Sequence, residues 1–197
     1  MENRIILITG PKHSGKTQCA RALGKITGGQ AIDLDEIIEK ETGRTPRELF
    51  LEGPAIFRKA ETLALERAIL ERVIMERSIN EAKDSCLPQS TMRIIAAGGG
   101  LIDNGEALEL IAQHAGIVIF YLDVLPETAW RRILDTASLD GKLPPFLDTE
   151  NPKETHLALH RRRAEAYIAF ADYTIGVDGK TPEEIALEIA NIMQKIT

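Results

Sequence analysis

The stretch RIILITGPKHSGKT, residues 4–17, joins a short apolar run directly to a glycine-rich loop. The apolar residues 5–9 predict a buried strand, and the segment 16–27 predicts the helix that follows the loop. Between them lies the pattern G-x-x-x-x-G-K-[ST], in which backbone N–H groups and the helix N-terminus point at an anion. Lys16 adds a point charge. The stretch therefore predicts an α/β fold with a site for the phosphates of a nucleoside triphosphate.

The predicted nucleotide-binding set is the whole loop, GPKHSGKT. Its members are Gly10, Pro11, Lys12, His13, Ser14, Gly15, Lys16 and Thr17. In such a loop the threonine hydroxyl is placed on Mg²⁺, so Thr17 is also a predicted metal ligand. His13 stands where these loops often carry another glycine, which would relieve the backbone. We expect its side chain to point to solvent, with a place beside the phosphates as the alternative.

Strand and helix signals alternate along the rest of the chain. Further strands are predicted over 31–35, 93–97, 116–122 and 173–177. Helices are predicted as a pair of short ones within 35–51 and as single ones over 54–80, 104–114, 126–136, 154–170 and 181–195. Loops are predicted over 84–91 and over 137–153, where the sequence has no periodicity. The alternation predicts a parallel sheet covered by helices on both faces, within a single domain of residues 1–197.

Composition narrows the class of protein. The chain has 197 residues, of which 44% are hydrophobic, and a net charge of −6. An acidic balance argues against a protein whose main partner is nucleic acid. The apolar runs are shorter than the roughly 20 residues that span a bilayer, and a cytoplasmic monomer without a membrane partner is the default expectation. Cys19 and Cys86 are expected to be free thiols, with Cys19 buried.

The loop alone leaves the reaction open. A GTPase would need a base-reading NKxD motif, which the sequence lacks. The strand predicted over 93–97 ends in Gly98, Gly99 and Gly100 rather than in the Asp-Glu pair usual in ATPase motors. The small size of the chain favours a kinase that acts on a small molecule.

Two carboxylates mark the predicted acceptor side. Asp33 and Asp35 end the strand predicted over 31–35, and a spacing of two residues places both on one face of a strand. One carboxylate could then serve Mg²⁺ while the other accepts a hydroxyl proton from the phosphate acceptor. Capping of the next helix by one of them is the alternative, and the spacing does not decide between these two interpretations.

Taken together, these motifs resemble the shikimate kinase family. The family's D-x-D is followed here by Ile38, Glu39 and Gly43, by Glu48 and Phe50, by Phe57, Arg58 and Glu61, and by Gly98, Gly99 and Gly100. Nearer the C-terminus, Arg163 stands four residues before Tyr167, as in the family's R-x-P-x-Y segment. The resemblance covers most of the chain. It implies a three-layer P-loop NTPase-type fold like that of nucleoside-monophosphate kinases, with a five-stranded parallel sheet, a substrate-binding segment at 33–62 and a mobile lid at 137–153.

The resemblance also implies a reaction and roles for individual residues. The reaction would be ATP-dependent phosphorylation of shikimate to shikimate 3-phosphate, in aromatic amino-acid biosynthesis, with ATP and Mg²⁺ as cofactors. Asp35 would hold and help to deprotonate the acceptor hydroxyl, and Asp33 would act on the Mg²⁺ shell. Arg58, oriented by Glu61, and Arg163 would hold the substrate carboxylate. The remaining implied contacts are those of Gly98, Gly99 and Gly100 with the substrate and of Arg132 with the adenine.

The lid departs from the family pattern. The family closes an arginine of an R-P-L-L segment over the transferred phosphate, whereas ASLDGKLPPFLDTEN, residues 137–151, contains no arginine. Lys142 is its one cation and completes a predicted catalytic set of Lys16, Asp35 and Lys142. A lysine neutralises charge but cannot form the bidentate contact of an arginine. Two other functions therefore stay open: a kinase of another hydroxylated carboxylic acid, such as a sugar acid, and a nucleotide-binding paralogue with little kinase activity.

An insertion is a further departure. The chain between Glu61 and Gly98 is about twenty residues longer than a compact family member needs, a length that loop-closure entropy tolerates. A surface extension is preferred here over a partner-binding surface.

Overall fold

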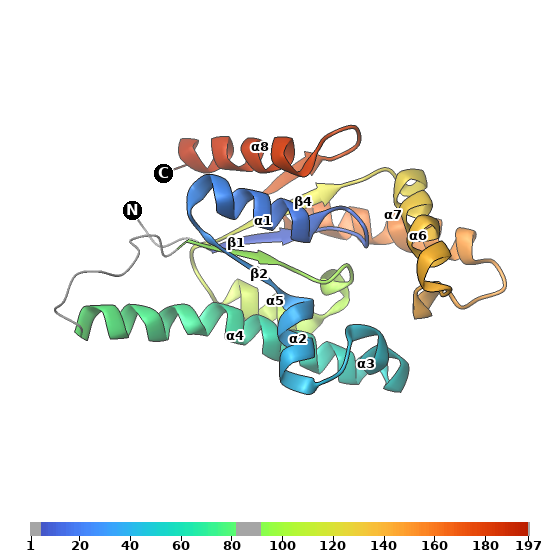
Figure 1. The fold of residues 1–197 in the computed structure, drawn as a ribbon, viewed down its shortest axis with the longest axis horizontal. Helices are drawn as coiled ribbons and strands as arrows, with labels where there is room; N and C mark the ends of the chain where they lie inside the picture. Colours follow the sequence, from blue (N-terminus) through green and yellow to red (C-terminus); the bar gives the residue numbers. More distant parts are fainter. Residues whose placement is uncertain (1–4, 82–91, 197) are drawn as a thin grey trace.

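The computed structural model describes residues 5–81 and 92–196, and places a five-stranded sheet at the centre of the molecule (Figure 1). The strands lie in the order β2-β3-β1-β4-β5, and every neighbouring pair is parallel. Their bounds are β1 (Ile5–Thr9), β2 (Gln30–Asp33), β3 (Arg93–Ala96), β4 (Ile117–Asp123) and β5 (Tyr173–Gly176). This confirms the predicted fold class.

Helices cover both faces of the sheet. The α-helices are α1 (Lys16–Thr27), α2 (Leu34–Thr42), α3 (Pro46–Glu52), α4 (Pro54–Glu81), α5 (Gly105–Ala112), α6 (Pro126–Asp140), α7 (Pro152–Phe170) and α8 (Pro182–Lys195). Two short 3₁₀ helices, η1 (Leu101–Asp103) and η2 (Pro145–Leu147), lie in connections. In Figure 1, α1 and α8 lie above the sheet and α2, α4 and α5 below it. The result is the predicted three-layer arrangement.

The side chains of β1 alternate between two hydrophobic cores, one on each face of the sheet. Ile6 and Ile8 pack with side chains of α1 and α8, whereas Ile5 and Leu7 pack with α2, α4 and α5. Successive side chains of a strand point to opposite faces, so a strand buried on both faces reads as a continuous apolar run. Cys19 of α1 lies fully buried in the first of these cores, as the sequence predicts.

Several boundaries differ from those predicted. Strand β2 ends at Asp33, and Leu34 already begins α2, so the strand predicted over 31–35 extends too far. Helix α6 continues to Asp140, four residues into the stretch predicted as a loop. The pair of short helices expected within 35–51 is confirmed as α2 and α3. Cys86 and the loop predicted over 84–91 lie outside the described residues.

Within residues 5–81 and 92–196, no helix has the length and hydrophobicity that crossing a bilayer requires.

Candidate functional site

A pocket of about 1000 Å³ opens where the parallel strands end at their carboxyl termini. Ligands of open α/β sheets bind in this place. Most predicted site residues line it, namely Lys12, His13, Ser14, Gly15, Lys16, Thr17, Asp33, Asp35, Arg58, Gly98, Gly99, Gly100, Arg132 and Arg163. Gly10 and Pro11, at the start of the loop, are buried and do not line the pocket, and Lys142 does not line it either. The structure therefore gathers predicted residues from six separate segments of the chain around one cavity.

The loop wraps around a buried lysine. Gly10 has φ +145, and a Cβ there would meet the Leu122 carbonyl oxygen at 2.7 Å, so this position requires glycine. The Lys16 Nζ donates to the Pro11 carbonyl oxygen at 2.8 Å. Burial lowers the pKa of Lys16 to about 8, although the charges of Asp35 and Asp33 raise it in part. Phosphate anions beside this ammonium group would favour its charged form.

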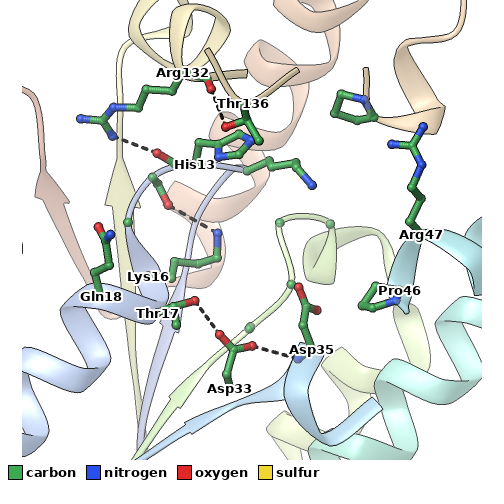
Figure 2. A pocket seen from close by; sticks show the side chains of 18 of the residues that line it. His13, Lys16, Thr17, Gln18, Asp33, Asp35, Pro46, Arg47, Arg132 and Thr136 are labelled. Carbon is green, nitrogen blue, oxygen red and sulfur yellow. Dashed lines mark hydrogen bonds between the residues drawn. The ribbon is translucent and has the colours of Figure 1, made fainter. Parts of the chain in front are cut away.

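His13 adopts a left-handed backbone conformation with φ 62, which explains why glycine is common at this position. Its carbonyl oxygen accepts a hydrogen bond from Arg132 Nη1 at 2.9 Å, so α6 holds the loop. His13 is half-buried and lines the pocket (Figure 2). The expectation that its side chain points freely into solvent is therefore wrong.

The two aspartates lie on different elements, which corrects the prediction that both lie on one strand. Asp33 ends β2 and caps α2, because its Oδ1 accepts from the Asp35 N–H at 2.9 Å. Its Oδ2 accepts from the Thr17 hydroxyl at 2.5 Å. Asp35 lies in the first turn of α2 and lines the pocket (Figure 2). Capping and a pocket-facing role, which the sequence left as alternatives, thus coexist in this pair.

Asp35 has a perturbed acidity. Its side chain is open to the pocket, but the pocket walls restrict its hydration. This desolvation and then the charge of Asp33 raise the pKa of Asp35 to about 6, against the opposing effect of Lys16. A carboxylate with a raised pKa, close to a phosphate-binding loop, has the properties of a general base.

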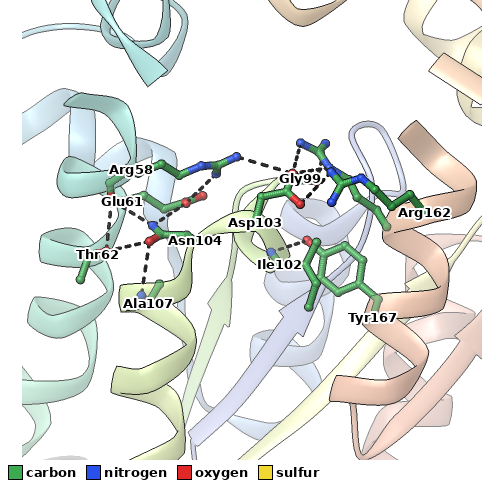
Figure 3. A network of polar contacts seen from close by, with 11 residues as sticks. Arg58, Glu61, Thr62, Gly99, Ile102, Asp103, Asn104, Ala107, Arg162 and Tyr167 are labelled. Atoms are coloured by element: carbon green, nitrogen blue, oxygen red, sulfur yellow. Dashed lines mark hydrogen bonds and ion pairs between the residues drawn. The ribbon is translucent and has the colours of Figure 1, made fainter. Parts of the chain in front are cut away.

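Arg58 and Arg163 both line the pocket. Figure 3 shows Arg58 with Glu61 on one side and Asp103 on the other. Arg58 Nη1 pairs with Glu61 Oε2 at 3.0 Å, as predicted, and Arg163 Nη1 donates to the Gly99 carbonyl oxygen at 3.2 Å. A Cβ on Gly100 would lie 2.9 Å from Arg58 Nη2 and 3.0 Å from Arg163 Nη2. Both guanidinium groups therefore converge over Gly100, where they could bind one carboxylate.

Sequence reasoning missed the residue that holds these arginines. Asp103 of η1 pairs with Arg163 Nη2 at 2.7 Å, with Arg162 Nη2 at 2.8 Å and with Arg58 Nη2 at 3.8 Å. Partial burial alone would raise the pKa of Asp103, but Arg163 and Arg162 outweigh it and lower the pKa. The neighbouring Asn104 donates to Glu61 Oε2 at 3.0 Å and caps α5. Asn104 could have been predicted, because asparagine is a common residue at the cap before a helix. Nothing in the sequence pattern indicates Asp103.

Replacing Asp103 by Asn is expected to lower the free energy of unfolding by about 1.5–3 kcal/mol at pH 7, because a hydrogen bond to a charged group contributes about that much. The lowered pKa means that this stabilisation is complete above the unfolded-state pKa of about 3.9 and is lost as pH falls through the folded-state value. Denaturant unfolding of both proteins should therefore show a difference that shrinks below about pH 4. Asp148→Asn, at an exposed position, is the control. A constant difference across pH would contradict the assignment.

The segment predicted as a lid, residues 137–153, contributes three apolar residues to the pocket lining. Pro144, Pro145 and Phe146 line the cavity, and the Phe146 ring lies 5.8 Å from the guanidinium carbon of Arg163. Lys142 is exposed and lies outside the lining. Arg47 of α3, which the sequence analysis did not single out, lines the pocket instead.

Comparisons with known proteins give one family for the whole length of the chain. The family model described as shikimate kinase matches residues 12–79 and 80–194. The shikimate kinase of Moorella thermoacetica is 32% identical over 195 residues, which cover 98% of this chain and 96% of the relative. That of Lactococcus lactis is 33% identical over 185 residues, covering 93% and 94%. The solved structure of Acinetobacter baumannii shikimate kinase in complex with shikimate shares the fold, with a TM-score of 0.76 at 24% identity over 100% of this chain and 96% of that one. The chain belongs to the shikimate kinase family.

Proposed function

We propose that this protein transfers the γ-phosphoryl group of ATP to the 3-hydroxyl group of shikimate, in aromatic amino-acid biosynthesis. The observation that carries the proposal is the convergence of Arg58 and Arg163 over Gly100, in the same pocket as the phosphate-binding loop. A pair of guanidinium groups suits a carboxylate, and Asp35 suits the hydroxyl beside it. The names of the relatives from Moorella thermoacetica and Lactococcus lactis support the same reaction.

The reaction is an in-line displacement at phosphorus. The hydroxyl oxygen of the acceptor forms a bond to the γ-phosphorus, the bond from that phosphorus to the β–γ bridging oxygen breaks, and ADP leaves with the electron pair. The hydroxyl proton passes to the Asp35 carboxylate and then to solvent. Positioning and charge neutralisation supply most of the rate enhancement in such transfers. In this role Asp35 orients the nucleophile, while Lys16 and the loop N–H groups hold the phosphates.

The residues also fit Mg²⁺. Mg²⁺ in kinases is usually bound by one or two carboxylates together with substrate phosphates and water. The Thr17 hydroxyl and the Asp33 carboxylate lie together at the base of the loop and would hold it there. Among the side chains that the structure describes, no group of three or more His, Cys, Asp or Glu could hold a metal ion. Bound Mg²⁺ would neutralise charge on the phosphate oxygens.

With ATP as the phosphoryl donor, the adenine would lie against Arg132, in the cavity that Lys180 and Pro182 also line. A monomeric state, a cytoplasmic location, and the division into a substrate-binding segment at 33–62 and a mobile lid at 137–153 stay predictions.

The test is a coupled assay of ADP release with shikimate and a panel of other hydroxylated carboxylic acids. We expect turnover that depends on shikimate and on Mg²⁺, with formation of one equivalent of shikimate 3-phosphate per ADP. Turnover with another acid alone would reassign the substrate. ADP release without any acceptor, or none at all, would overturn the proposal.

A further inference from the structure

Arg47 stands apart from the other arginines of the pocket. Five arginines line the cavity: Arg21, Arg47, Arg58, Arg132 and Arg163. Four of them have a partner on the protein, a carboxylate or, for Arg132, a carbonyl oxygen. Within the described part of the chain, Arg47 has neither a hydrogen bond nor an ion pair. A half-buried guanidinium without a protein partner is available to an anionic ligand.

Capping contacts at the start of α3 hold the backbone around Arg47. Thr45 caps this helix: its hydroxyl accepts from the Glu48 N–H at 3.2 Å, while Glu48 Oε2 accepts from the Thr45 N–H at 2.7 Å. Pro46 then occupies the first helical position, where its fixed φ suits the helix, and it lines the pocket too. Arg47 follows in the first turn. Its backbone is thus held by local contacts, while its side chain is left free.

The side chain faces the loop across the pocket. Figure 2 shows Arg47 on the wall opposite Lys16 and Thr17, with Asp35 between the two walls. Helix α3 also contacts η2, the part of the lid segment that lies over the cavity. Arg47 is therefore positioned in the pocket wall on the helix that contacts η2.

The positively charged side chains that line the pocket are unevenly distributed around Arg47. On the loop side, Lys12 and Lys16 line the cavity, and the charges of both act on Asp35. On the far side, Arg58 and Arg163 are held by Asp103. The lid contributes proline and phenylalanine side chains to the lining and no cation. A phosphoryl group in transfer from the loop to the acceptor beside Asp35 thus has Lys12 and Lys16 on its loop side, while Arg47 is a lining cation on the acceptor wall that has no hydrogen bond or ion pair within the described part of the chain.

We propose that Arg47 contacts the transferred phosphoryl group from the acceptor wall and neutralises charge on its equatorial oxygens, the role that the sequence had led us to expect of Lys142. The inference rests on the proposed function, because it concerns the same transfer of phosphorus from the ADP oxygen to the acceptor hydroxyl. A guanidinium suits this role because its planar fork can bind two oxygens at once.

The test compares kcat and KM of the Mg²⁺–ATP reaction in four variants. Arg47→Ala should lower kcat by about 10²–10³-fold, with smaller changes in KM for either substrate, because the contact is made in the transition state. Arg47→Lys should recover part of the loss. Arg44→Ala, three residues away and paired with Glu52, is the matched control and should leave kcat unchanged. Lys142→Ala should have a smaller effect than Arg47→Ala.

A second measurement does not depend on turnover. Aluminium fluoride with ADP and shikimate mimics the phosphoryl group in transfer, and calorimetry should show that Arg47→Ala weakens binding of aluminium fluoride while ADP and shikimate bind as before. Since Arg47 makes no hydrogen bond or ion pair within the described part of the chain, Arg47→Ala should unfold at nearly the same denaturant concentration as the wild-type protein.

The outcomes separate the two claims. Unchanged kcat and aluminium fluoride binding in Arg47→Ala, with an active wild-type protein, would overturn the role of Arg47 alone. A wild-type protein that uses another hydroxylated acid would overturn the substrate, and Arg47 would then be measured with that acid. A wild-type protein without turnover on any acid would overturn both.

Discussion

Asp35→Asn is expected to lower kcat for shikimate phosphorylation by about 10²–10⁴-fold, the range that a general base contributes. The amide keeps the size and the hydrogen-bonding oxygen of the carboxylate but cannot take up the hydroxyl proton. The raised pKa of Asp35, about 6, brings it closer to the operating pH than an ordinary aspartate and leaves it ionised at neutral pH. Steady-state kinetics with saturating Mg²⁺–ATP measure the effect.

Glu39→Gln is the matched control for this variant. Glu39 lies one turn further along α2, is exposed and does not line the pocket, so kcat should stay within about twofold of the wild-type value. KM for ATP should change little in Asp35→Asn, because Asp35 lies on the acceptor side. Retention of more than a tenth of wild-type kcat by Asp35→Asn would show that Asp35 positions the hydroxyl without removing its proton.

Local sequence patterns predict those elements whose structure follows from their own residues. The apolar run at 5–9, the loop at 10–17 and the helical periodicity of 54–80 each indicate one structure, and the structure confirms all three. The alternation of strands and helices predicts the parallel sheet, because consecutive parallel strands require a crossover on one face or the other.

The pair Asp33 and Asp35 shows where a pattern is ambiguous. A spacing of two residues places both on one face of a strand, but the same residues also begin a helix well. The structure uses Asp33 as the helix cap, because its side chain satisfies the free N–H of Asp35. The sequence therefore predicts that both aspartates belong to the site but not how they are arranged. The boundary between β2 and α2 depends on which backbone N–H groups find a hydrogen-bond acceptor.

Asp103 and Arg47 show what the sequence does not contain. Asp103 lies in a 3₁₀ turn after three glycines. Two of the arginines that it holds lie 59 and 60 residues later, on α7, and the third lies 45 residues earlier, on α4. Arg47 is one of several arginines in a polar segment, and its place in the pocket wall depends on how α3 packs against η2. Long-range packing decides both.

The buried contact of Arg58 gives the largest expected effect on stability. Glu61 is 1% exposed, and its Oε1 has no hydrogen-bond partner in the described part of the protein. Arg58→Met would leave this carboxylate with only the amide of Asn104. The loss of one partner of a buried ion pair costs about 3–5 kcal/mol, and we expect the unfolding free energy to fall by that amount. Turnover with shikimate should fall at the same time, because one of the two guanidinium groups over Gly100 is gone.

A double variant separates the two effects. In Arg58→Met/Glu61→Gln the buried charge is absent, and the glutamine oxygen can still accept from Asn104, so we expect more than half of the lost stability to return. Turnover should stay low, because no guanidinium is restored. Arg67→Met, on the exposed face of the same helix and paired with Glu41, should cost less than about 1 kcal/mol. If the double variant is as unstable as Arg58→Met, the packing of the arginine stem rather than an unpaired Glu61 is what stabilises this helix; if Arg58→Met keeps its turnover, Arg163 alone is enough to hold the acceptor carboxylate.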